Sequence, residues 1–435
     1  MEGCHRLMRV YTLNRVVHWS IFGLLFPIII LMILEKGLDL FQAGVVFSTY
    51  SAAIILLELP TGGLSDTIGR KKVYLASMAA NLLGVVVVIL SWEFYTVAAG
   101  FLFLGVGRAL ASGSIDAWFI DEYHRINGES GLQKAIAKVE VFVAIGIATS
   151  SIIGGLLPMT LGPLTAEVGG WDIYTGNLLI IAMMIVLQTI LTQRLVVEEL
   201  DGSEESTALS GLRKLPQVLA SSMEYGVRNR IILLLLAGMV VFGFGLSGVE
   251  LLWQPKLKDI IGNDSDTWIF GLVSAGYFLM GVAGNIAVTP LCRRLNENYV
   301  LALFLIRLMV GAMLFSLALQ EGAVGFVLFF LLVFMFNSME TSPRAVILNS
   351  EVPNEKRSTI LSFESLVFQL GVIAGKVTMG YISNTYSIGS AWTVGAALVF
   401  ISCSVFVAPS MVRKGRDFVS GKDIEESQDR SHHVL

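Results

Sequence analysis

Long apolar runs, separated by short charged or turn-forming segments, make up most of the chain. The runs are residues 14–34, 41–63, 73–91, 94–120, 138–158, 174–195, 231–253, 268–291, 299–319, 322–347, 359–383 and 389–411. Each contains about 20 residues or more, which at about 1.5 Å per helical residue crosses a hydrocarbon core about 30 Å thick. Lipid offers the backbone no hydrogen-bond partners, so each run is expected to form a helix. The pattern predicts an all-α polytopic membrane protein with twelve transmembrane helices.

One long polar segment, residues 196–230, separates the first six runs from the last six. It opens with the acidic, serine-rich sequence EELDGSEES, and its second part shows the helical spacing of a surface-lying amphipathic helix at Leu212, Leu215, Leu219 and Met223. The polar tail is expected to be disordered. The predicted parts are an N-terminal six-helix bundle (1–195), a cytoplasmic central loop with an amphipathic helix (196–230), a C-terminal six-helix bundle (231–412) and a cytoplasmic tail (413–435).

The composition agrees with lipid as the solvent of this fold. Of 435 residues, 54% are hydrophobic and 15% are charged, whereas a soluble domain carries about 25% charged residues. The net charge of −4 provides no basic field, so no nucleic-acid partner is expected. Cys4, Cys292 and Cys403 show no metal-binding spacing, and we expect no disulfide framework, metal site or cofactor.

The distribution of positive charge predicts the orientation in the membrane. Lysine and arginine concentrate before the first run, in every second loop and after the last run, whereas the intervening loops hold only Lys36, Lys256 and Lys258. By the positive-inside rule, both termini and the central loop face the cytoplasm of a bacterial-type inner (plasma) membrane. No small-residue cleavage site follows the first run, so it is expected to be an uncleaved spanning helix rather than a signal peptide.

A glycine-rich charged motif follows the second run. It reads GGLSDTIGRKK from Gly62 to Lys72, and its glycines permit a tight turn while Asp66 and Arg70 place opposite charges near helix ends. The motif resembles the signature G-x-L-a-D-r-x-G-r-k of the major facilitator superfamily. Together with twelve runs and a long central loop, the resemblance covers nearly the whole chain. It implies two six-helix bundles, a small-molecule substrate and a monomer.

The resemblance also implies a conformational latch. In that family the aspartate, here Asp66, binds the end of the eleventh helix, and the arginine, here Arg70, binds an acid at the end of the fourth. Asp121 or Glu122 is suitably placed for Arg70. The predicted latch residues are Gly62, Asp66, Gly69, Arg70 and Asp121; the alternative is a solvated turn. The counterpart CRRLNEN at 292–298 lacks the aspartate, so any latch is asymmetric.

Two further patterns resemble elements of the drug:proton antiporter (multidrug efflux) branch. Arg108 to Gly113 is similar to the R-x-x-x-x-G element that is associated with proton coupling. The fifth run resembles the antiporter signature G-x-x-x-G-P-x-x-G-G, with serines in place of the central Gly-Pro. Small side chains there are expected to allow close packing against the eighth helix. The residues concerned are Gly146, Ser150, Gly154 and Gly155.

Charged residues inside the apolar runs are candidates for transport and proton coupling, because a charge at the bilayer centre costs at least about 2.5–3.5 kcal/mol. Arg108 is expected to face a central cavity, with Asp116 or a carboxylate from another helix as its partner; a purely structural pair is the alternative. Glu340 is expected to pair with Arg344. The candidates are Arg108, Asp116, Glu250, Glu340 and Lys376.

Two of these candidates, and three further carboxylates, also allow interpretations other than proton coupling. Lys376 either favours an anionic or zwitterionic substrate or pairs with a carboxylate of the seventh or tenth helix. Glu250 lies near the end of its run and is a candidate interfacial residue. Three further carboxylates lie close to the ends of their runs, and for these snorkelling or interdomain salt bridges are favoured over proton carriage: Glu58, Glu140 and Glu364.

The leading functional hypothesis is an exporter of amphiphilic or drug-like compounds in exchange for protons. A proton-driven symporter that imports a small organic solute is the second hypothesis, and a non-transporting sensor or scaffold is the third. An enzyme is not expected, because no catalytic cluster or phosphate-binding loop occurs in a polar segment.

A phenylalanine-rich tenth run is interpreted as core or lipid-facing. Pro27, Gly243, Gly245 and Gly248 are predicted bending points.

Overall fold

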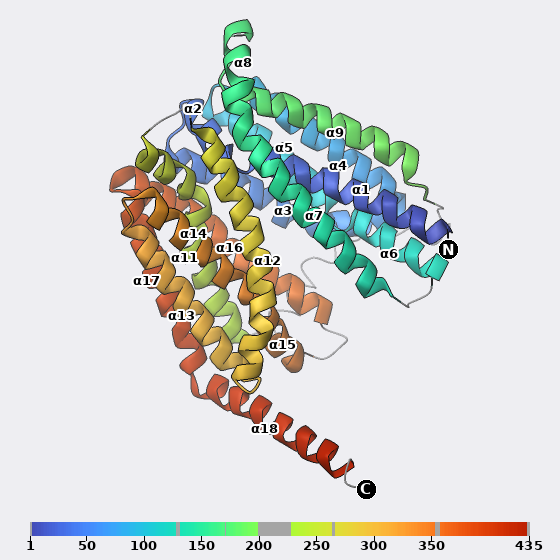
Figure 1. The fold of residues 1–435 in the computed structure, drawn as a ribbon, viewed down its shortest axis with the longest axis vertical. Coiled ribbons are helices and arrows are strands. Elements are labelled where there is room, and N and C mark those ends of the chain that lie inside the picture. Colours follow the sequence, from blue (N-terminus) through green and yellow to red (C-terminus); the bar gives the residue numbers. More distant parts are fainter. Residues whose placement is uncertain are drawn as a thin grey trace. The chain divides into compact units, whose positions relative to one another are not determined.

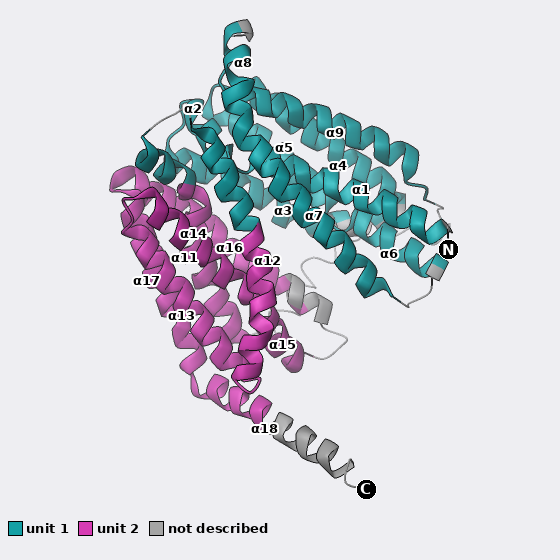
Figure 2. Cartoon of the chain, viewed as in Figure 1, with its two compact units in different colours: residues 1–217, 254–278 teal, residues 218–253, 279–435 magenta. Residues whose placement is uncertain are grey.

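The computed structural model describes residues 2–127, 131–169, 171–198, 228–262, 266–352 and 357–432. Within these ranges every regular element is a helix and there is no strand, so the predicted all-α class is confirmed. The amphipathic helix predicted at Leu212–Met223 lies outside the described residues. The chain forms two compact units, residues 1–217 with 254–278 and residues 218–253 with 279–435 (Figure 2).

The first half of the chain contributes nine helices to the described structure (Figure 1). Within the first unit α4 packs along α5, and α7 packs along α1. The helices are α1 (Glu2–Leu25), α2 (Ile29–Glu35), α3 (Leu40–Ile68), α4 (Arg70–Ile89), α5 (Phe94–Ala111), α6 (Ser114–Asn127), α7 (Leu132–Thr160), α8 (Gly162–Gly169) and α9 (Thr175–Leu195).

The second half of the described chain begins with a helix that starts at Arg230. Within the second unit α13 packs against α14 and α17. The elements are α11 (Arg230–Ile261), α12 (Thr267–Arg294), α13 (Tyr299–Ala318), α14 (Ala323–Met339), α15 (Thr341–Glu351), α16 (Arg357–Thr385), α17 (Ile388–Cys403), the 3-10 helix η2 (Ser404–Val407) and α18 (Pro409–His432).

The number of spans agrees with the sequence pattern. Within the described ranges, eleven helical segments are long and apolar enough to cross a membrane, and α1 with α2 forms a bent pair that gives a twelfth. Here α5 with α6 counts as one segment, and so does α14 with α15. Six segments therefore precede residues 196–230 and six follow, as the apolar runs predict.

The first span bends by 44° between α1 and α2, at the predicted bending point Pro27. Proline has no amide hydrogen to donate and cannot continue the helical hydrogen-bond ladder. At the bend, the fully buried side chain of Gln254 binds the carbonyl of Phe26 and the amide of Ile30, two groups that would bond to each other in a continuous helix. Its Nε2 donates to the carbonyl of Phe26 over 2.6 Å, and its Oε1 accepts from the amide of Ile30 over 2.8 Å.

Two runs that were predicted as single helices are interrupted. Between α5 and α6, Gly113 has a φ of +75°, a conformation that glycine adopts without steric cost. Between α14 and α15 the interruption falls at Glu340. Asp116 lies just after the first interruption, and Glu340 lies at the second.

The expectation of a disordered tail is wrong for the described residues after Val412. They continue as helix α18, whose Lys414 Nζ lies 2.6 Å from Glu351 Oε1. The ring of Phe418 packs edge-on against that of Tyr299, with 5.1 Å between their centroids. The start of α18 is therefore held to the second unit by an ion pair and an apolar contact.

The small residues of α7 pack closely against two neighbours within the first unit. A Cβ atom at Gly155 would lie 2.6 Å from the amide nitrogen of Gly271 in α12, the eighth span, and Thr267 Oγ1 donates to the carbonyl of Gly155 over 2.7 Å. A Cβ at Gly154 would meet the backbone of Leu24, and one at Gly146 the side chain of Val16. Ser151 and Gly155 therefore lie against the eighth span, whereas Gly146 and Gly154 face α1.

Candidate functional site

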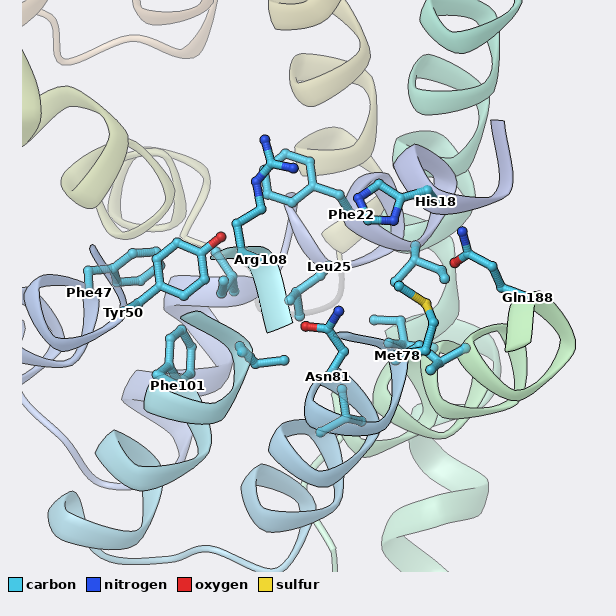
Figure 3. A pocket seen from close by; sticks show the side chains of 16 residues that line it. His18, Phe22, Leu25, Phe47, Tyr50, Met78, Asn81, Phe101, Arg108 and Gln188 are labelled. Atoms are coloured by element: carbon cyan, nitrogen blue, oxygen red, sulfur yellow. The ribbon is translucent and has the colours of Figure 1, made fainter. Parts of the chain in front are cut away.

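The first unit contains an apolar cavity with a volume of about 140 Å³ (Figure 3). Residues from α1, α2, α3, α4, α5 and α9 surround it. Most lining side chains are aliphatic or aromatic, among them Phe22, Phe47 and Phe101. The polar groups on its wall are few, and they are contributed by His18, Tyr50, Asn81, Arg108 and Gln188.

Arg108 is the permanently charged member of this lining. It lies in the last turn of α5, and its guanidinium carbon is 5.3 Å from the centre of the Trp19 ring, a cation–π contact. Among the side chains that the structure describes, no carboxylate oxygen lies within ion-pair distance of this guanidinium. Arg108 therefore faces a cavity, as expected, but without the expected carboxylate partner.

Asp116 pairs with a different arginine. Arg15 of α1 places Nη1 3.4 Å from Asp116 Oδ1, while the Tyr11 hydroxyl donates to Oδ1 of the same carboxylate over 2.8 Å. The predicted pairing of Arg108 with Asp116 is therefore wrong. Asp116 lies on α6, which follows the break at Gly113, and its partner comes from α1.

Arg15 also holds a second carboxylate. Its Nη2 lies 3.2 Å from Glu140 Oε1 on α7, so one guanidinium serves two carboxylates. The side chains of Asp116 and Glu140 are 40% and 52% exposed, whereas that of Arg15 is 14% exposed. This bridge joins two helices of the first unit, so it is not the interdomain salt bridge expected at Glu140. Arg15 was not singled out from the sequence, because it precedes the core of the first apolar run.

Trp19 contacts both Arg15 and Arg108. The guanidinium carbon of Arg15 is 5.7 Å from the centre of its ring, and that of Arg108 is 5.3 Å from the same centre. Both guanidinium groups therefore contact the same indole ring. A change in the charge near either arginine acts on the other over a short distance.

A buried hydrogen-bond network supports the other side of the cavity. Gln188 Nε2 donates to the Tyr74 hydroxyl over 2.7 Å, and that hydroxyl donates to Asn14 Oδ1 over 2.8 Å. Asn14 Nδ2 donates in turn to Thr192 Oγ1 over 2.6 Å. The network ties α1, α4 and α9 together. Gln188 Oε1 is buried and has no hydrogen-bond partner in the described part of the chain.

The glycine-rich motif connects α3 to α4. Gly69 has a φ of +101°, which favours glycine, and Arg70 forms an ion pair with Asp121 in the middle of α6. The amides of Arg70 and Lys71 donate to the carboxylate of Glu198 over 2.7 and 3.0 Å, as suits an anion at a helix N-terminus. Gly62 and Asp66 lie on α3, and the placement of their side chains is outside what the structure describes.

The superfamily is decided by comparison with known proteins. The family model of the Major Facilitator Superfamily matches residues 12–376. The chain belongs to the Major Facilitator Superfamily. The uncharacterized MFS-type transporter YxaM of Bacillus subtilis (strain 168) is 24% identical over 418 residues, which cover 93% of this chain and 96% of that protein.

Solved structures agree on the major facilitator fold. The nucleoside transporter NupG matches with a TM-score of 0.75 at 13% identity, over 92% of this chain and 98% of its own. A bacterial homologue of the iron transporter ferroportin, in an inward-facing state, matches with a TM-score of 0.73 at 14% identity, over 92% and 98% of the two chains. The protein is therefore a transporter of the superfamily, and these structural matches show its fold.

The second unit of this major facilitator protein carries a fully buried ion pair. Arg307 on α13 donates from Nη2 to Glu340 Oε1 over 2.5 Å and from Nε over 3.0 Å. Its guanidinium carbon lies 4.6 Å from the centre of the Phe242 ring and 4.9 Å from that of Phe406. The expected pairing of Glu340 with Arg344 is wrong, because Glu340 pairs with Arg307 of α13, while Arg344 pairs with Glu364.

The remaining candidates of the second unit also find partners. Lys376 Nζ on α16 lies 3.7 Å from Glu250 Oε2 on α11, the seventh span, which matches the pairing reading of Lys376. Phe326 and Phe330 of the phenylalanine-rich run are fully buried and pack against Trp392 and Trp253, which matches the core reading of that run. In the described ranges no three His, Cys, Asp or Glu residues are grouped to hold a metal ion.

Proposed function

We propose that this major facilitator protein is a secondary active transporter that couples a small amphiphilic solute to protons. It would act as a monomer in the plasma membrane by alternating access, with both termini and residues 196–230 on the cytoplasmic side. The observation that carries proton coupling is the sharing of Arg15 between Asp116 and Glu140 next to the cavity.

The cluster has the chemistry that proton coupling needs. A carboxylate can carry a proton where its contact with a cation is made in one conformational state and broken in another. Asp116 and Glu140 are both partly open to solvent, so protons can reach them. Because they come from α6 and α7 and depend on one arginine of α1, a small shift of α1 changes both contacts.

Efflux in exchange for protons is the direction that the sequence patterns around Arg108 and Gly155 support. The second candidate is import together with protons. It is favoured by one observation: the charged group on the cavity wall is a cation, and no carboxylate contributes to that wall among the described residues. Exchange of a cationic drug for a proton by direct competition would need a carboxylate at that place.

The test is transport in reconstituted vesicles with an imposed pH gradient. Asp116→Asn and Glu140→Gln, singly and together, should abolish accumulation driven by the gradient. They should preserve counterflow, the exchange of labelled for unlabelled solute without a gradient. Glu167→Gln, at an exposed position of α8, is the matched control. Accumulation that persists in the double variant would contradict this site, and the direction of proton movement would separate exchange from symport.

A further inference from the structure

We infer that the cavity of the first unit binds an organic anion whose apolar part is about the size of one aromatic ring, with its anionic group at Arg108. The inference rests on the proposed function, in that this cavity is taken to hold the transported solute. It adds the chemical class of that solute, which neither the fold nor the contacts of Arg15 with Asp116 and Glu140 specify.

Charge is the first argument. Arg108 reaches the cavity wall and has Trp19 as its neighbour, while the nearby carboxylates Asp116 and Glu140 are both held by Arg15. A guanidinium in apolar surroundings without a carboxylate partner is costly, and an anionic ligand would compensate that cost through charge-assisted hydrogen bonds. A cationic ligand would meet the opposite situation, because the described lining offers it no negative charge.

Size is the second argument. An apolar cavity of about 150 Å³ accommodates one benzene molecule, whereas pockets for drug-sized ligands measure about 300–1,000 Å³. The volume of about 140 Å³ in the first unit therefore corresponds to a single ring. The rings of Phe47 and Phe101, whose centroids are 5.4 Å apart, form part of an aromatic wall suited to such a group.

A buried acceptor is the third argument. Gln188 is fully buried, and its Oε1 has no hydrogen-bond partner in the described structure although its Nε2 is bound to Tyr74. Figure 3 shows its amide group directed toward the other lining side chains. Buried acceptors are seldom left unpaired, so this oxygen marks a place for a donor group on the ligand.

A consequence concerns coupling. An anion beside Arg108 and a proton on Asp116 or Glu140 would stabilise each other electrostatically, because Arg108 and Arg15 contact the same Trp19 ring. Such coupling is reciprocal by thermodynamic linkage. Anion and proton would then be bound together and move together. The inference therefore favours the second candidate, symport, over exchange.

The experiment measures binding to the full chain in lipid nanodiscs by titration calorimetry. The probes are benzoate, neutral benzyl alcohol, cationic benzylamine and acetate, which separate the contributions of charge and ring. We expect benzoate to bind at least about tenfold tighter than each of the others, because a charged hydrogen bond contributes about 1.5–3 kcal/mol and 1.4 kcal/mol is tenfold. Arg108→Gln should remove this preference, whereas Arg108→Lys should keep part of it.

Arg194→Gln, the same change at an exposed position of α9, is the control and should bind as the unchanged chain does. Thermal unfolding of each variant shows that it is folded. Equal or tighter binding of benzylamine, absence of benzoate binding, or benzoate binding that Arg108→Gln leaves intact would each overturn the inference. The proposed function fails separately, if a pH gradient drives none of the bound compounds into vesicles, whichever charge they carry.

Discussion

The two units differ in how they hold an arginine that lies within an apolar span. In the first unit Arg108 lies at the wall of a cavity and contacts an indole ring without a carboxylate partner among the described side chains. In the second unit Arg307 is fully buried between two phenylalanine rings and bound by Glu340 through two hydrogen bonds.

The difference extends to the other charges. In the first unit Asp116 and Glu140 share Arg15 and remain partly exposed. In the second unit Arg307 pairs with Glu340, Lys376 with Glu250 and Lys414 with Glu351. Arg307 and Glu340 are buried, and Arg307 Nη1 and Glu340 Oε2 have no hydrogen-bond partner among the described residues. Asp116 and Glu140, in contrast, are partly open to solvent, from which a proton can reach them. The proposals above place solute and proton binding in the first unit, which also has a buried ion pair of its own between Lys36 and Asp172, with 3.1 Å between Nζ and Oδ2.

The largest expected effect compares one substitution at two places. Arg307→Met would leave Glu340 charged and unpaired in an apolar interior, and should lower the free energy of unfolding by about 3–5 kcal/mol. Arg108→Met removes only a cation–π contact and should cost no more than about 1 kcal/mol. Thermal unfolding in detergent micelles measures both. Equal losses in the two variants would remove the distinction between the units.

A double variant sharpens this first prediction. Replacing Arg307 and Glu340 together by methionine removes both charges, and an ion pair replaced by apolar residues of similar size is often neutral in stability. The double variant should therefore recover most of the loss of Arg307→Met. No recovery would mean that the shape of this cluster, rather than its charge, governs the stability of the second unit.

The intermediate effect lies in the shared cluster of the first unit. Tyr11→Phe removes the hydroxyl that donates to Asp116 but keeps the ring, which stacks on Phe119 with 3.9 Å between centroids. The loss should be about 0.5–1.5 kcal/mol, the contribution of one hydrogen bond. Chemical denaturation can resolve it. A loss in the free energy of unfolding as large as that of Arg307→Met would show that the Arg15, Asp116 and Glu140 contacts stabilise the fold rather than change between transport states.

The smallest effect on stability is expected at the predicted latch. Arg70 and Asp121 form a largely exposed ion pair, which contributes about 0–1 kcal/mol. Asp121→Asn should thus leave the unfolding temperature nearly unchanged, yet raise the labelling of cysteines placed near the ends of α3 and α6 if the pair acts as a latch. Glu122→Gln is the neighbouring control. Unchanged labelling and an unchanged transport rate would show that the pair is no latch and that the motif is a solvated turn.

Much of the architecture follows from local properties of the sequence. Apolar length sets the number of spans, and proline and glycine set the bend at Pro27 and the turn at Gly69, because both depend only on neighbouring residues. The charge partners could not be predicted in the same way. The Arg15–Asp116 contact joins residues 101 positions apart, and its formation depends on the break at Gly113.

The sequence by itself determined that this chain spans a membrane with two sets of six apolar segments, since hydrophobic length and the backbone's need for hydrogen bonds leave no other solution in lipid. It also named the charged residues that such a solvent penalises. Only the tertiary structure decided which of them are satisfied, because helix rotation and helix breaks determine which side chains meet. That is why Arg108 faces a cavity while Arg307, equally apolar in its sequence surroundings, is bound by Glu340.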